Sequence, residues 1–105
     1  LDYDSTLGFA DRAGFRCGVC YEFPMYDVIR RKALKLKQRP LIAMDCSIIG
    51  TQYMGLGAGE RALECLRNLK NTCRAYHGDF VILWHNTRYV VDAENSLYRR
   101  IIKEA

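Results

Sequence analysis

Three polar side chains stand at or near the ends of candidate strands, and their types could carry out acid–base chemistry. Residues 80–84 form an apolar run rich in β-branched and aromatic side chains, and His85 follows it directly. Such a run predicts a strand buried on both faces, as in a parallel sheet. Asp45 closes a similar run over 41–45, and Arg16 lies in a third candidate strand. Because the working groups of α/β folds gather at the carboxyl ends of strands, these three residues are candidate site residues.

Each candidate also has a purely structural interpretation. His85 could be satisfied by a neighbouring carbonyl at the strand end. Trp84 could stack on a sugar ring or simply fill the core. Arg16 could form an ion pair that contributes only about 0–1 kcal/mol if it is exposed. Its possible partners are Asp4, Asp11 and Asp45.

The cysteines offer a second kind of chemistry. There are five, at positions 17, 20, 46, 65 and 73, and an odd count argues against a disulfide framework. Cys17 and Cys20 form a Cys-x-x-Cys motif, but the predicted strand over 15–20 places them on opposite faces. A structural zinc site needs four ligands, and Cys46 and His85 are the plausible additions. A zinc or thiol-redox protein therefore remains an alternative.

Length and composition predict one soluble globular domain. The chain has 105 residues, of which 50% are hydrophobic and 27% charged. The net charge of +4 is spread along the chain, so nucleic-acid binding is not indicated.

No apolar run reaches the roughly 18 residues of a membrane span, and no signal peptide opens the chain. With Cys65 and Cys73 on a helix face as small hydrophobes, we expect a cytoplasmic protein. The start at Leu1 suggests a piece of a longer protein.

Two helices are predicted in the second half of the chain. Over 60–76, apolar residues recur at spacings of three and four, with Tyr76 as the last of them and Gly78 as the C-cap. A final helix runs through residue 104 and is expected to begin at a cap formed by Asn95 or Ser96. Its inward residues are Leu97 and Ile101, with Tyr98 and Ile102 as further possibilities.

The remaining segments complete a βαβα order. Residues 21–26 contain Pro24 and are expected on the surface or a sheet edge. The basic segment 27–37 is compatible with a short helix or an extended strand. Residues 46–59 hold four glycines and predict a loop with a brief turn. The order implies that 41–45 and 80–84 pair in parallel through a right-handed crossover.

A family resemblance gives these residues a specific meaning. Tyr3-Asp4-Ser5, Gly14-Phe15-Arg16-x-Gly18, the run from Pro40-Leu41 to Met44-Asp45, and Leu83-Trp84-His85 occur in this order along the chain. The set resembles polysaccharide deacetylases of carbohydrate esterase family four, and more closely a bacterial branch of deacetylase-like proteins. The resemblance covers most of the chain but only the C-terminal part of the family's domain. It implies an α/β fold that is the C-terminal portion of a distorted (β/α) barrel, with parallel strands and crossover helices.

The resemblance also implies an activity. The family removes N- or O-acetyl groups from sugars or polysaccharides with a divalent metal, usually zinc, that activates water. An aspartate acts as base and a histidine protonates the leaving group. His85 matches that histidine, Leu83 the leucine of the acetyl pocket, and Arg16 the arginine that orients the base. Trp84 and Asp45 are further substrate-binding candidates, although the family's usual tryptophan is missing beside Asp45.

The resemblance places the metal ligands outside the chain. The family binds its metal with an aspartate and two histidines, in motifs that would lie upstream of Leu1. The two histidines present, His77 and His85, are expected on different sides of the sheet. We therefore expect no metal in this chain and no activity from it alone. The alternative is a carbohydrate-binding module without catalysis, or one that forms homo-oligomers through open sheet edges.

Overall fold

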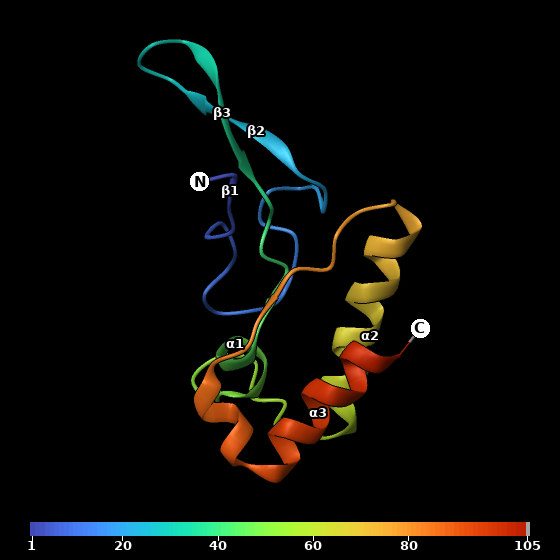
Figure 1. The fold of residues 1–105 in the computed structure, drawn as a ribbon. Coiled ribbons are helices and arrows are strands. Elements are labelled where there is room, and N and C mark those ends of the chain that lie inside the picture. The colour runs from blue at the N-terminus through green and yellow to red at the C-terminus, as the bar shows by residue number, and fades with distance from the viewer. Residues whose placement is uncertain (105) are drawn as a thin grey trace.

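The chain is a mixed α/β structure with two regions joined by a short parallel strand pair (Figure 1). The computed structural model describes residues 1–104. One region is a small sheet at the N-terminal end, and the other holds the helices. The molecule is elongated, with extents of 47 × 28 × 22 Å. No helix in the described part of the chain is long and apolar enough to span a bilayer.

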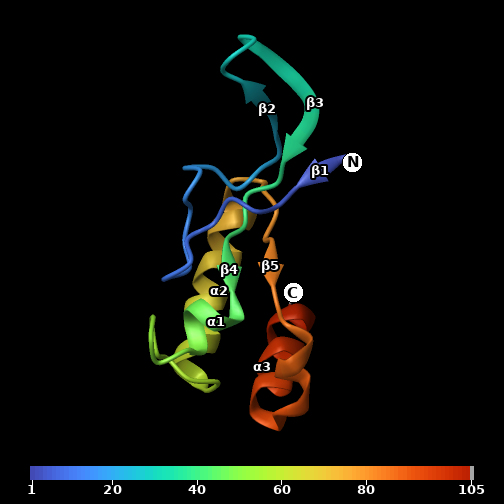
Figure 2. The same ribbon diagram turned by 90° about the vertical axis from the view of Figure 1, so that its left-hand side faces the viewer.

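The predicted parallel pair is confirmed. Strand β4 (Ala43–Met44) lies beside β5 (Ile82–Leu83), with Ala43 opposite Ile82 and Met44 opposite Leu83 (Figure 2). Both strands are shorter than the predicted runs. On one side, Asp45 does not end β4 but opens the short helix α1 (Asp45–Ile49). At the other end of the pair, before β5, the hydrogen bonds depart from the regular ladder, because the amides of Ile42 and Ala43 both donate to the Val81 carbonyl.

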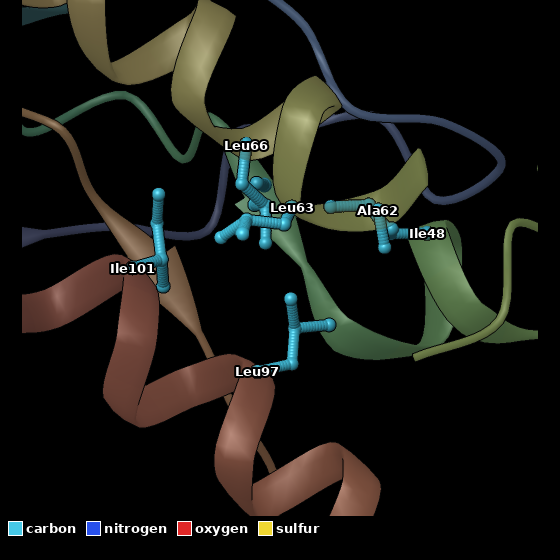
Figure 3. Close-up of a cluster of buried hydrophobic side chains, with 7 residues drawn as sticks. Ile48, Ala62, Leu63, Leu66, Leu97 and Ile101 are labelled. Atoms are coloured by element: carbon cyan, nitrogen blue, oxygen red, sulfur yellow. The ribbon is translucent and has the colours of Figure 1, made fainter. Parts of the chain in front are cut away.

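The predicted apolar helix faces form the core. Helices α2 (Glu60–Ala75) and α3 (Asp92–Lys103) contact each other, and their buried side chains pack in one cluster with Ala43 of β4. The inward positions Leu97 and Ile101 are confirmed, whereas Ile102 is exposed. Figure 3 shows this cluster, which unites both helices, α1 and β4. Its buried members are Ala43, Ile48, Ala62, Leu63, Leu66, Leu97 and Ile101.

The helix ends differ from prediction. Helix α2 stops at Ala75, so Tyr76 leaves the apolar face and is 70% exposed. The left-handed residue after it is His77, with φ 55°, and not Gly78. Helix α3 begins at Asp92, before the predicted cap at Asn95 or Ser96, and Val91 separates it from the 3₁₀ helix η1 (Asn86–Val90). Its acidic first turn, with Asp92 and Glu94, suits the positive end of the helix dipole.

The N-terminal sheet was not fully predicted. Strand β3 (Lys32–Gln38) pairs in parallel with β1 (Tyr3–Asp4) and antiparallel with β2 (Phe23–Asp27). The basic segment is thus extended and not helical. In β3 the leucines at 34 and 36 are partly buried, while the lysines between and beside them are exposed, which is the period of two that a half-buried strand requires.

The predicted strand over 15–20 is wrong. This segment turns, with the Gly18 amide donating to the Phe15 carbonyl at 3.0 Å and Gly18 at φ 74°, a value that favours glycine. Its end, Cys20, is buried against Ile42 and Cys73 and so attaches the segment to α2. The predicted loop over 46–59 is also modified, because α1 occupies its start.

Gly78 is needed for close approach. A Cβ at this position would lie 2.3 Å from the Cys20 Sγ and 2.6 Å from the Cys20 carbonyl oxygen. We expect Gly78→Ala to lower the free energy of unfolding by about 1–3 kcal/mol, because the backbone contact must open. Gly59→Ala is the matched control, since nothing lies within 4 Å of its added Cβ. Urea unfolding measures both, and equal stability of the two variants would contradict the packing described here.

Candidate functional site

Asp45 is a buried carboxylate held between two strand ends. Its exposed fraction is 0%, and Oδ1 accepts the Cys46 amide at 2.8 Å. The His85 amide donates to Oδ2 at 2.9 Å, and the His85 ring Nδ1 lies 2.7 Å from Oδ1. The parallel register creates this contact, because Met44 stands opposite Leu83 and both chains leave the sheet at the same edge. The structure therefore joins Asp45 and His85, which the sequence had placed at neighbouring strand ends.

Arg88 completes the cluster from η1. Its Nε lies 3.3 Å from Asp45 Oδ2, its Nη1 donates to Glu94 Oε1 at 2.9 Å, and its Nη2 donates to Cys46 Sγ at 3.6 Å. Glu94 belongs to the first turn of α3. One guanidinium thus connects η1 with α1 and α3, and a planar fork can do this where a lysine ammonium could not.

The pKa of Asp45 is set by two opposing effects. Burial raises it, because a low-dielectric environment disfavours the charged form. Hydrogen bonds from the His85 amide and ring, and from the Cys46 amide, lower it and prevail, so the pKa lies below its usual range. Asp45 is therefore ionised at neutral pH despite complete burial.

His85 presents its ring to solvent while Asp45 holds one nitrogen. The side chain is 45% exposed, and Nδ1 faces the carboxylate. A carboxylate accepts a hydrogen bond, so this geometry places the proton of the neutral ring on Nδ1. Nε2 is then the nitrogen available to exchange a proton with a bound molecule. The pair can act as an oriented acid or base.

Three residues of the cluster have side chains of the types that bind metal ions. One donor atom each from Asp45, Cys46 and His85 lies within 4.8 Å of the others. A zinc site needs three or four ligand atoms that are free to bind the metal. Both Asp45 oxygens already accept backbone N–H groups, and His85 Nδ1 is hydrogen-bonded to Asp45 Oδ1. The Arg88 cation stands 3.3 Å from the carboxylate and would repel a metal ion. These residues do not fit the divalent metal that the family resemblance implies.

Leu83 and Trp84 point in different directions from β5. Leu83 is 42% exposed, whereas Trp84 packs against the core cluster and its ring centroid lies 5.5 Å from that of Tyr98. The indole Nε1 is buried and has no acceptor among the described residues. The geometry favours the core interpretation of Trp84 over an open stacking platform.

Arg16 lies in other contacts. Its exposed guanidinium donates to the Gly8 carbonyl at 3.0 Å. Within residues 1–104 no ion pair joins it to any of the three aspartates considered above. Asp4 accepts from Thr6 and Gln38, Asp11 pairs with Arg12, and Asp45 has the partners already described. No contact therefore brings Arg16 to the His85 pair.

Two participants were missed from the sequence, and a third, Cys46, was considered only as a possible zinc ligand. Cys46 follows Asp45 directly, Arg88 comes three residues after His85, and Glu94 lies six residues further on. The spacing from His85 to Arg88 is one turn of a 3₁₀ helix, but in the sequence Asn86-Thr87-Arg88 is typical of an ordinary turn. No pattern in the sequence links Glu94 to it.

The Cys-x-x-Cys motif does not assemble a site in the described residues. The donor cluster that contains Cys46 and His85 includes neither Cys17 nor Cys20. All five cysteines are free thiols. Cys20 instead packs on Cys73. The pKa of Cys73 is raised to about 12, mainly because the thiol is buried and to a smaller extent because Cys20 lies beside it. These are the features of structural thiols.

Comparisons with known proteins add nothing to this geometry. No family model, no curated protein and no solved structure matches the chain. The function is therefore argued from the cluster itself.

The Asp45 charge should make stability pH-dependent. The Asp45→Asn variant should be less stable at pH 7 by ~1–3 kcal/mol, because hydrogen bonds to a charged group are lost. The folded-state pKa lies below the unfolded value of about 3.9, so this advantage is complete above that value. It is lost as the pH falls through the folded-state pKa.

Urea unfolding at pH 7 and pH 3 of both proteins measures this effect. The difference between wild type and variant isolates Asp45 from other carboxylates with lowered pKa values, such as Glu22 and Glu104. A difference that stays constant or grows between pH 7 and pH 3 would show that the Asp45 charge is not stabilising.

Proposed function

We propose that this chain supplies the proton-transferring part of a carbohydrate deacetylase site, which removes N- or O-acetyl groups from acetylated sugars or polysaccharides. In this proposal it forms the C-terminal portion of a distorted (β/α) barrel, as the sequence resemblance implies. The observation that carries the proposal is the Asp45–His85 pair, with 2.7 Å between Oδ1 and Nδ1, at the carboxyl edge of two parallel strands.

His85 would act as general acid. Loss of an acetyl group leaves an amine or alkoxide that must take up a proton, and an imidazolium Nε2–H positioned in solvent can donate it. Asp45 would hold Nδ1–H, orient the ring and stabilise the imidazolium without itself taking the proton. The lowered pKa of Asp45 supports this role, because the carboxylate must remain charged while His85 cycles.

Leu83 supports a binding surface beside His85. Residues two apart on an extended segment point to the same side, and both Leu83 and His85 are exposed. An apolar side chain next to the acid suits the methyl group of an acetyl substrate. The family's metal would supply water activation when bound, but the cluster described here does not fit it. Arg16 remains a candidate for orienting a base carboxylate, without a contact in its favour.

The test is acetate release by the product of the gene that encodes this sequence, on an acetylated glucosamine oligomer. His85→Ala should lower kcat by about 10²–10⁴-fold, the usual contribution of a general acid, with a smaller change in KM. Asp45→Asn should lower kcat less, and His77→Ala is the matched control. Full kcat in His85→Ala would refute the assignment.

The 105-residue chain alone should release no acetate, because the donor atoms of Asp45 and His85 are already engaged in hydrogen bonds and the Arg88 cation lies beside them. Reproducible metal-dependent release by this chain would overturn that expectation.

A second candidate is an assembly module. Among residues 1–104, strands β4 and β5 pair only with each other, so each has an open edge. A second exposed apolar surface lies in the turn after β2, at Val28 and Ile29. If this is the function, sedimentation of the chain should give a concentration-dependent mass above one protomer, reduced by Ile29→Lys. A monomer at all concentrations would exclude it.

A further inference from the structure

Cys46 is a thiol that the proposed proton transfer does not use. It is partly exposed and lies between two groups that can carry positive charge. Arg88 Nη2 approaches the Sγ to 3.6 Å, and His85 Nδ1 lies 3.7 Å away. Arg88 gives its other nitrogens to Glu94 and Asp45, so Nη2 is the one directed at sulfur.

The other thiols lack this environment. Burial raises the pKa values of the partly buried Cys17 and Cys65, and of Cys73 most strongly. Cys20 is buried. Because the thiolate is the nucleophile, a nearby guanidinium and an open path favour reaction, whereas apolar burial suppresses it. The carboxylates of Asp45 and Glu94 oppose this effect, but both are already paired with Arg88.

We propose that Cys46 is a selective site of modification by low-molecular-weight disulfides. The Cys46 thiolate attacks one sulfur of the small disulfide, a new S–S bond forms, and the second sulfur departs as a thiolate that takes up a proton. Cys46 is oxidised to a mixed disulfide, and half of the reagent is reduced to thiol. A second small thiol reverses the reaction.

The adduct would act on the pair described above. It replaces the contact from Arg88 and fills space beside the His85 ring, because both lie within 3.7 Å of Sγ. If His85 transfers protons as proposed, modification would switch that step off, so this consequence rests on the proposed function. The reactivity of Cys46 does not.

The first experiment treats the folded chain with oxidised glutathione and maps the products by mass spectrometry. We expect one glutathione adduct, on Cys46. A limiting amount of iodoacetamide should alkylate Cys46 at least ~10-fold faster than Cys17 and Cys65 in the same molecules. Equal rates at the three sites, or a Cys20–Cys73 disulfide as the main product, would overturn the proposal.

Two variants test the role of Arg88. Arg88→Gln should lower the ratio of the Cys46 rate to the Cys17 rate severalfold, and an unchanged ratio contradicts the mechanism. Unfolding would reveal itself by labelling of Cys20 and Cys73, which are buried in the native chain. Glu94→Gln then decides: it frees the guanidinium from its carboxylate and should raise the ratio, whereas a lower ratio counts against the proposal.

The outcomes separate this inference from the proposed function. Selective labelling of Cys46, together with full acetate release by His85→Ala in the gene product, would support the thiol site and refute His85 as the general acid. Unselective labelling of the thiols, together with a large loss of acetate release in His85→Ala, would refute the Cys46 site and support His85 as the general acid.

Discussion

A buried, ionised carboxylate is the constraint around which this chain is arranged. Asp45 has no exposed surface, and an unpaired charge in that environment would cost several kcal/mol. The chain meets this cost with the amides of Cys46 and His85, the ring of His85 and the Arg88 guanidinium. These partners come from the starts of α1 and η1 and from the end of β5. The positions of these elements are therefore tied to one charge.

The same constraint explains why β4 and β5 are short. Each strand contributes two residues to the ladder before its chain turns to reach the carboxylate. Two ladder pairs would not hold the strands alone, so the helices supply the packing, with Leu63, Leu66 and Ile101 fully buried. Packing thus sets the distance between the strands, and the Asp45 hydrogen bonds set the direction of the His85 ring.

The sequence predicted those parts of the fold that depend on periodic burial. The parallel pair, helix α2 and the neighbouring ends at Asp45 and His85 follow from local apolar patterns. Three features did not, because they depend on contacts distant in sequence. Cys20 reaches α2 only because Gly78 has no side chain, Arg88 finds Glu94 through the register of η1 against α3, and the segment over 15–20 turns at Gly18.

The cluster also shows how one arrangement of charge serves groups of opposite needs. Asp45 must stay ionised, which Arg88 and His85 favour. The Arg88 charge must not neutralise the Asp45 carboxylate so completely that the carboxylate no longer attracts His85. Arg88 contacts Glu94 and Cys46 as well as Asp45, so its charge is shared among the three. Arg88 Nη2 is the nitrogen that contacts the partly exposed sulfur of Cys46. Because His85 Nδ1 and Arg88 Nη2 both lie beside the Cys46 sulfur, a modification of this thiol would also disturb the contact between Asp45 and His85.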